Sequence, residues 1–208
     1  RGIHVLGEKP MASTLDGCRR ILKTAKDAPA LYQIGLELRS GPIWQRVHQL
    51  AAEGRIGKVR QLWCKEFRGP WLVKVGQWIV QQARSDGTLV EKDCHHFDLF
   101  NWFVGERPLR VAGFGTCDLV HGAERFGGVT PDILDNGQVL VQYEGGATAA
   151  LMLCMYCDNH HGLELGLIGT EGSMVASVGA RDVLKIMSRT GGEETTIEFT
   201  PAPEIQQL

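Results

Sequence analysis

Two short stretches of this sequence bring together the side-chain types that bind and move protons. The first is Glu8-Lys9-Pro10, which directly follows the apolar stretch Ile3–Leu6. A lysine and an acid then lie at the carboxyl end of a predicted parallel strand, the edge at which open α/β sheets bind ligands. Taken alone, the tripeptide fits a surface turn with two solvated charges equally well.

The second stretch, residues 87–99, opens a predicted helix with histidines and acids. One face of that helix carries four side chains at i, i+4, i+7 and i+11 spacing: Glu91, His95, Asp98 and Trp102. An acid one turn before a histidine can orient the imidazole and set its tautomer, as a general base requires. Lys92 and His96 lie on a neighbouring face. The alternative interpretation is a helix with satisfied core histidines and an ordinary intrahelical ion pair.

A third group of residues resembles a zinc site only superficially. Cys154 and Cys157 are followed by His160 and His161. On the strand predicted there, thiols at i and i+3 point to opposite faces unless the strand ends or bulges between them. The histidines also follow too closely for the usual zinc-finger spacing. We therefore expect no metal site, and we assign the two histidines to the lining of a polar pocket.

Composition narrows the functional class. Hydrophobic residues make up 43% of the 208 residues, charged residues 22%, and the net charge is -2. A balanced surface of this kind does not favour nucleic acid or an acidic membrane, because both select a clustered positive excess. The sequence has no apolar run near the roughly 20 residues of a membrane helix, and its first ten residues do not resemble a signal peptide. With six scattered cysteines, it fits a cytoplasmic protein with reduced thiols.

The chain begins with the pattern of a parallel α/β unit. Ile3–Leu6 predicts a short buried strand, Ser13 or Thr14 can cap a helix that runs to about Lys26, and residues 31–38 predict a second strand. Strand, helix and strand with short links form a parallel unit. One such unit cannot bury both faces of its sheet, so we expect the rest of a doubly wound domain to precede residue 1.

From residue 39 onward the pattern changes to an α+β domain. Helices are predicted at 42–54 and 90–104, and a strand at 59–67. Further strands are predicted at 109–117, 139–143, 147–156, 163–168, 183–187 and 195–199. Glu144-Gly145-Gly146 is typical of a tight hairpin turn. Consecutive hairpins predict a largely antiparallel open sheet.

These features, in this order, resemble the Gfo/Idh/MocA oxidoreductase family. The strand ending in Glu-Lys-Pro is similar to the family's most recognisable segment, and Glu91, His95 and Asp98 match its central-helix motif. Segments 33–42 and 54–59 resemble the junction between the two domains, and 135–136, 143–146 and 169–172 resemble hairpins of the second sheet. The resemblance implies that 1–38 is an α/β remnant of a Rossmann-type domain. It implies that 39–208 is an α+β substrate and oligomerisation domain, truncated at its C-terminal end.

The resemblance also implies an activity, a cofactor and site residues. The intact protein would transfer a hydride between NAD or NADP and a sugar, inositol or related polyol. The implied catalytic residues are Lys9, His95 and Glu91, with His95 as the base, Glu91 orienting it and Lys9 stabilising the substrate oxygen. The implied cofactor contacts are Glu8, Lys9, Arg39 and Trp78. The implied substrate contacts are Trp71, Lys74, Lys92, His96 and His161.

Other functions on the same scaffold stay open at this point. A redox-assisted glycoside-cleaving enzyme would use the same residues without net accumulation of reduced cofactor. A non-catalytic ligand-sensing relative would not need Lys9 and His95, and a purely structural module leaves the Glu91–His95 spacing unexplained. No G-x-G-x-x-G fingerprint occurs in the 208 residues, so the choice between NAD and NADP is not encoded here. An open sheet with one bare face predicts a homodimer or homotetramer.

Overall fold

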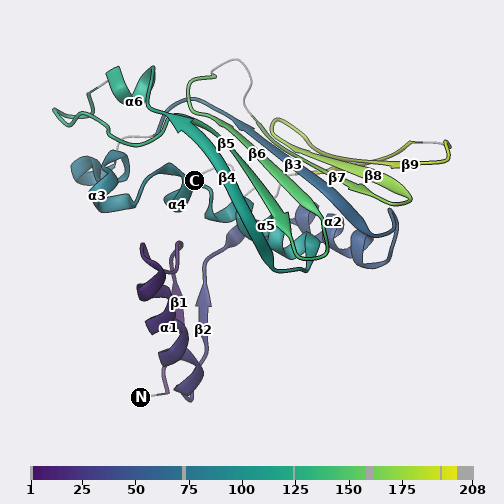
Figure 1. Cartoon of the computed structure of the whole chain (residues 1–208), viewed down its shortest axis with the longest axis horizontal. Coiled ribbons are helices and arrows are strands. Elements are labelled where there is room, and N and C mark those ends of the chain that lie inside the picture. Colours follow the sequence, from purple (N-terminus) through teal and green to yellow (C-terminus); the bar gives the residue numbers. More distant parts are fainter. Residues whose placement is uncertain (1, 72–73, 124, 158–161, 193, 201–208) are drawn as a thin grey trace.

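The computed structural model describes residues 2–71, 74–123, 125–157, 162–192 and 194–200, and it places a small N-terminal unit beside a large sheet (Figure 1). In the small unit, β1 (Val5–Gly7) pairs in parallel with β2 (Tyr32–Ile34), and α1 (Leu15–Asp27) connects them. The Thr14 side chain caps α1 by accepting a hydrogen bond from the backbone N–H of Gly17 at 3.1 Å. The parallel strand–helix–strand unit expected from the sequence is therefore present.

Two details of the small unit differ from expectation. The first strand is not buried, since Val5 is 47% and Leu6 74% exposed. Within the described part of the chain, β1 pairs with β2 alone and one helix accompanies the pair, which leaves much apolar surface uncovered. The second strand also ends early, at Ile34, and a short 3-10 helix, η1 (Glu37–Ser40), follows it.

The large sheet has eight strands in the order β10-β9-β8-β7-β3-β6-β5-β4. Their bounds are β3 Val59–Phe67, β4 Pro108–Thr116, β5 Asn136–Tyr143, β6 Thr148–Cys154, β7 Gly162–Gly169, β8 Gly172–Val178, β9 Asp182–Ser188 and β10 Thr195–Phe199. All neighbours are antiparallel except β3 and β6, which run in parallel with Leu62 opposite Ala149. The predicted largely antiparallel sheet is confirmed. Strand β8 was not predicted.

Two helices cover one face of this sheet, α2 (Pro42–Ala52) and α5 (Cys94–Val104) (Figure 1). Trp44 and Val47 of α2 and Phe100 of α5 pack with sheet residues such as Leu62 and Leu165, all of them 2% exposed or less. The other face carries exposed apolar side chains, among them Phe114 and Leu140. The sheet therefore has one covered and one open face.

Short helical segments fill the end of the sheet next to the small unit. They are η2 (Val75–Val80), α3 (Gln82–Ser85), α4 (Thr88–Glu91) and α6 (Val120–Ala123). The continuous helix predicted for residues 90–104 is interrupted, because α4 ends at Glu91 and α5 begins at Cys94. None of the helices in the described ranges has the length and apolar character needed to cross a membrane.

Candidate active site

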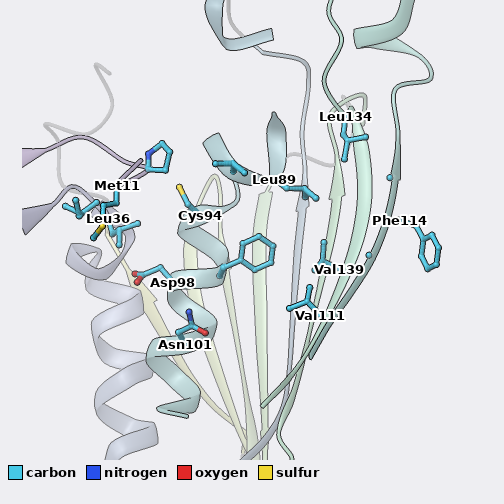
Figure 2. A pocket seen from close by; sticks show the side chains of 16 residues that line it. Met11, Leu36, Leu89, Cys94, Asp98, Asn101, Val111, Phe114, Leu134 and Val139 are labelled. Atoms are coloured by element: carbon cyan, nitrogen blue, oxygen red, sulfur yellow. The ribbon is translucent and has the colours of Figure 1, made fainter. Parts of the chain in front are cut away.

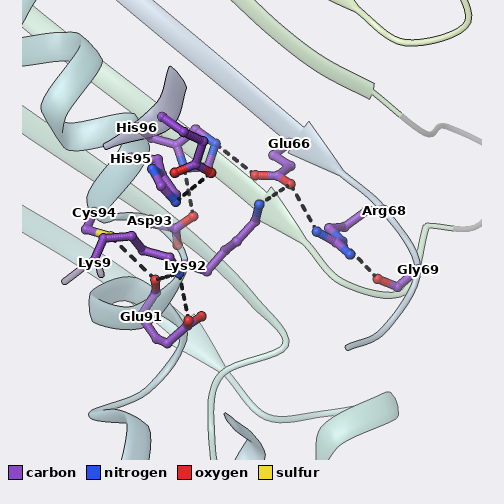
Figure 3. A network of polar contacts seen from close by, with 11 residues as sticks. Lys9, Glu66, Arg68, Gly69, Glu91, Lys92, Asp93, Cys94, His95 and His96 are labelled. Atoms are coloured by element: carbon purple, nitrogen blue, oxygen red, sulfur yellow. Dashed lines mark hydrogen bonds and ion pairs between the residues drawn. The ribbon is translucent and has the colours of Figure 1, made fainter. Parts of the chain in front are cut away.

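A lysine from the small unit reaches across to the large domain. Lys9, in the loop after β1, donates hydrogen bonds from Nζ to the backbone oxygen and to Oε1 of Glu91, each at 2.7 Å (Figure 3). The Lys9–Pro10 peptide bond is cis. The two side chains are only 17% and 9% exposed, so this ion pair is largely shielded from water. The two stretches that the sequence singled out, 82 residues apart, meet here.

His95 lies in the first turn of α5, almost fully buried. Its Nε2 atom is 3.3 Å from Oε1 of Glu37, whose side chain is 67% exposed, and its Nδ1 atom has no hydrogen-bond partner among the described residues. Burial lowers the pKa of His95 below its ordinary value, and the positive charges of Lys9 and Lys92 lower it further, while Glu37 opposes them. His95 is therefore a neutral imidazole at neutral pH, the form that accepts a proton.

The expected contact between Glu91 and His95 is not formed. The sequence prediction placed both on one face of a continuous helix, but the chain leaves the helix between Glu91 and Cys94, so the spacing of four no longer aligns them. Glu91 pairs with Lys9 instead, and the acid beside His95 is Glu37. Glu37 was missed by the sequence analysis. Its position just after the second parallel strand was the available signal, because ligand-binding residues gather at that edge.

A buried acid on the central strand was also missed. Glu66 follows Leu62 and Cys64 at the alternating positions of β3 that face the core. Its carboxylate is 3.0 Å from Nζ of Lys92 and 2.8 Å from Nε2 of His96, and 3.5 Å from the guanidinium of Arg68 (Figure 3). Burial alone would raise the pKa of Glu66, but His96 and Lys92 outweigh it and lower the pKa to about 2. The signal that could have revealed Glu66 in the sequence was the presence of an acid at a core-facing strand position.

His96 lies between two carboxylates. Its Nδ1 atom is 3.0 Å from Oδ1 of Asp93, while Nε2 faces Glu66, and the side chains of His96 and Asp93 are both 0% exposed. Burial alone would lower the pKa of His96, but the contacts with Asp93 and Glu66 raise it to about 9. The sequence assigned His96 to the substrate, yet the structure encloses it completely. His96, the residue directly after His95, is buried because it lies on the side of α5 that packs on the sheet.

Glu66, Asp93 and His96 are also residue types that bind metal ions, although the sequence predicted no metal site. One ligand atom from each of Glu66, Asp93 and His96 lies within 4.8 Å of the others. The two carboxylates face opposite ring nitrogens of His96 and form ion pairs with them, and the absence of a metal site stays a prediction. The geometry is that of a chain of ion pairs.

Arg39, predicted to contact the cofactor, makes a bidentate pair with Asp98. Its Nε and Nη2 atoms donate to the carboxylate at 2.6 and 2.7 Å, and its guanidinium lies 5.2 Å from the centre of the Trp102 ring. The helix face predicted from Asp98 and Trp102 is thus occupied by Arg39. The cofactor role of Arg39 stays a prediction.

The remaining predicted residues differ in how far they are buried. Trp71 is 9% exposed with Arg68 over its ring at 5.6 Å, Trp78 is half-buried, and Lys74 is exposed. Glu8 is exposed beside Lys9. His161 and His160 lie outside the described residues, and so the polar pocket proposed for them stays a prediction.

An apolar cavity of 740 Å³ adjoins the site (Figure 2). It lies between the small unit, α5 and the sheet, and its wall includes Pro10, Met11, Leu36, Cys94, Phe97 and Val139. Pro10 and Cys94 are the chain neighbours of Lys9 and His95, but neither Lys9 nor His95 lines it. We therefore infer that the cavity provides apolar contacts beside the proton-handling groups and that the proton transfer takes place outside it.

With this geometry established, the comparison with known families is decisive. The family model described as "GFO/IDH/MocA C-terminal domain" matches residues 44–175 of this chain. The chain belongs to the GFO/IDH/MocA family. The levoglucosan dehydrogenase of Pseudarthrobacter phenanthrenivorans is 25% identical over 211 residues, covering 89% of this chain and 52% of that protein. The scyllo-inositol 2-dehydrogenase (NAD(+)) of Bacillus subtilis is 22% identical, covering 91% and 53%. The chain thus spans about half the length of these GFO/IDH/MocA relatives.

Solved structures of GFO/IDH/MocA-like oxidoreductases share the fold. A levoglucosan dehydrogenase in complex with NADH and levoglucosan superposes with a TM-score of 0.81 at 21% identity, covering 100% of this chain and 58% of that one. An aldose-aldose oxidoreductase from Caulobacter crescentus complexed with glycerol gives a TM-score of 0.76 at 24% identity, covering 97% and 58%. At these identities the likeness establishes the fold and leaves the substrate to other evidence.

Proposed function

We propose that the intact protein is an NAD(P)-dependent oxidoreductase that transfers a hydride between a nicotinamide cofactor and a CH–OH group of a sugar, inositol or related polyol. The observation that carries the proposal is the contact between Lys9 and Glu91, which brings an ammonium group from the end of a parallel strand to a neutral, buried histidine. The names of the curated relatives, a levoglucosan and an inositol dehydrogenase, support the substrate class.

His95 and Lys9 handle the proton in this proposal. To oxidise a carbinol, the C–H hydrogen leaves with its electron pair as hydride, and the hydroxyl proton passes to the imidazole of His95. The Lys9 ammonium donates a hydrogen bond to the same oxygen and stabilises the developing alkoxide. Glu91 positions Lys9 through the 2.7 Å contact. In the direction of reduction, His95 returns the proton.

Unpartnered polar atoms support a ligand with several hydroxyl groups. Among the described residues, the buried polar atoms without a hydrogen-bond partner include Oε2 of Glu91, Nδ1 of His95 and Nε1 of Trp71. Unpaired buried donors and acceptors are costly, and a polyol supplies the complementary groups. Lys92 and Lys74 are the proposed further contacts to this substrate. His96, being enclosed, is moved to a positioning role.

The carboxyl end of β1 and β2 suits the nicotinamide side of the site. Both strands end beside Lys9, the edge where open α/β sheets bind dinucleotides. Glu8, Lys9, Arg39 and Trp78 are the residues of this chain proposed to hold the cofactor there. When bound, the nicotinamide supplies the hydride acceptor for oxidation and the donor for reduction.

The test is turnover of the intact protein with inositols, levoglucosan and open-chain polyols, using NAD and NADP in turn. His95→Gln and Lys9→Met are expected to lower kcat by roughly 10²–10⁴-fold, while Lys26→Met, on the exposed side of α1, is a matched control expected to leave it unchanged. Wild-type turnover in His95→Gln contradicts the assigned role. Product formed without net reduced cofactor indicates redox-assisted glycoside cleavage, and binding without turnover indicates a sensing protein.

We further propose that two copies associate through the open face of the sheet. Phe114 is 87% and Leu140 60% exposed on this face, and a bare apolar face of this kind favours association. Leu140→Asp is expected to convert the associated form to monomers in light scattering. A clean monomer of the unsubstituted intact protein contradicts the proposal.

A further inference from the structure

The contacts of His96 fix its protonation state. Both ring nitrogens face a carboxylate, Nδ1 at 3.0 Å from Asp93 and Nε2 at 2.8 Å from Glu66. An ionised carboxylate only accepts hydrogen bonds, so two ionised partners are satisfied only when both nitrogens carry hydrogen. Burial raises the pKa of Asp93, and the contact with His96 opposes that rise and favours the ionised form. His96 is then an imidazolium, although its side chain is 0% exposed.

The chain of charges continues from His96 toward the site. Glu66 also faces Lys92 and Arg68, so that two buried acids hold three cations between β3 and the first turn of α5. His95 is the residue directly before His96 in that turn. A fixed positive charge on His96 therefore lies next to the group proposed as the base.

We propose that Glu66 and Asp93 are positioning residues that hold His96 as a permanent cation and thereby keep His95 unprotonated at neutral pH. This inference rests on the proposed role of His95 as the base. It assigns to a wholly buried group an effect on the reaction that requires no contact with substrate.

Burial is the largest cause of the lowered pKa of His95, and the surrounding charges add to it. The groups that act on it are Glu37 from η1, Lys9 from the loop after β1, Lys92 from the segment before α5, and His96 from α5 itself. Three cations thus oppose one acid, and that acid is 67% exposed and screened by water. Without its two carboxylates, burial would remove the proton from His96, and the pKa of His95 would rise by the share that the His96 charge contributes.

The first test reads the histidine charges directly. In the intact protein with ¹⁵N-labelled histidine, NMR at pH 7.5 is expected to show His96 with both ring nitrogens protonated and His95 neutral. A neutral His96 in the unsubstituted protein overturns the proposal, and so does a charged His95. Because these spectra do not depend on turnover, they decide the question even if no polyol proves to be a substrate.

The second test removes one carboxylate. In Glu66→Gln, His96 is expected to lose its proton near neutral pH, and the acidic limb of the kcat/KM profile is expected to move up by about one pH unit, a tenfold lower rate on that side. The variant removes a negative and a positive charge, and of the two residues only His96 is among the groups that act on His95. Asp93→Asn is the second variant if Glu66→Gln does not fold.

The matched control is Glu164→Gln on β7. Glu164 also pairs with a lysine, Lys65 at 3.2 Å, but its side chain is 32% exposed and its other polar contact is with Ser177, not with a histidine. This variant is expected to leave both the histidine spectra and the acidic limb unchanged. If His96 loses its proton in Glu66→Gln and the limb does not move, His96 does not set the state of His95, and the proposal is wrong.

Discussion

The β1–α1–β2 unit and the eight-stranded sheet differ sharply in how much apolar surface they bury. In α1 the only residue classed as buried is Gly17, and Leu15 and Leu22 are exposed. In the large sheet, Leu62 and Leu165 are both 0% exposed. Yet the candidate site takes Lys9 from the first region and His95 from the second. The difference teaches that the proton-handling groups depend on a contact between a weakly packed unit and a firmly packed one.

Hydrogen exchange should display this contrast most strongly. Amides of β3, β6 and β7 lie in the centre of the sheet and are expected to exchange only through global unfolding, whereas those of β1 and β2 open locally. We expect roughly a thousandfold difference in protection, measured by exchange mass spectrometry on the intact protein. Equal protection in both regions would mean that the small unit is held by more than the described contacts.

Truncation of a leucine to alanine should lower the free energy of unfolding by several kcal/mol more in the large sheet than in the small unit. Leu165→Ala removes a fully buried side chain from β7 and is expected to lower the free energy of unfolding by about 2–5 kcal/mol. Leu22→Ala, its control in α1, removes a side chain that is 50% exposed and is expected to cost below about 0.5 kcal/mol. Chemical denaturation measures both. A large effect of Leu22→Ala would contradict the comparison.

The pH dependence of stability should come from the large domain. The pKa of His96 is raised from 6.5 to about 9, so its contribution is fully present below pH 6.5 and is lost as the pH rises to about 9. The pKa of Glu66 is lowered from 4.5 to about 2, so its contribution is present above pH 4.5 and is lost as the pH falls to about 2.

Each limb should approach a slope of about 1.4 kcal/mol per pH unit, the value for one proton. Thermal unfolding followed from pH 3 to 10 tests this, with Glu66→Gln expected to flatten both limbs. An unchanged profile in that variant would show that other groups control the titration.

The smallest effect is expected at the tie between the regions. Arg39, just after the small unit, forms a bidentate pair with Asp98 of α5, but its side chain is 43% exposed. We expect Asp98→Asn to cost no more than about 1 kcal/mol, decreasing further at high salt, since exposed pairs contribute little. A loss of several kcal/mol would show that this pair, rather than the Lys9–Glu91 contact, fastens the two regions together.

Much of the fold could be predicted because alternation and turn residues are local signals. The strands at 59–67, 109–117 and 195–199 and the turn at Glu144–Gly146 were found in this way. Strand β8 was missed because its buried positions are Gly172, Met174 and Ala176. Two of these three residues are too small to give an apolar alternation, although neighbouring strands bury them.

The site was predictable as a set of residues but not as a set of contacts. Lys9, Glu91 and His95 were all singled out, yet the pairing of Glu91 depends on a helix interruption that the continuing periodicity concealed. Glu66 and Glu37 were missed because their partners lie far away in the chain, and only the three-dimensional arrangement brings them together.

The place of β3 in the sheet has a consequence for how the molecule is made. Strands β4 to β6 and β7 to β10 are each meanders of sequential neighbours, whereas β3 lies between them and pairs with residues of β6 and β7 that come 87 to 110 positions later. A ribosome must therefore have released β7 before β3 can find both neighbours. The partners of Glu66, by contrast, are Lys92 and His96, which leave the ribosome well before β6 and β7, so the polar contacts of the candidate site do not have to wait for the sheet to close around β3.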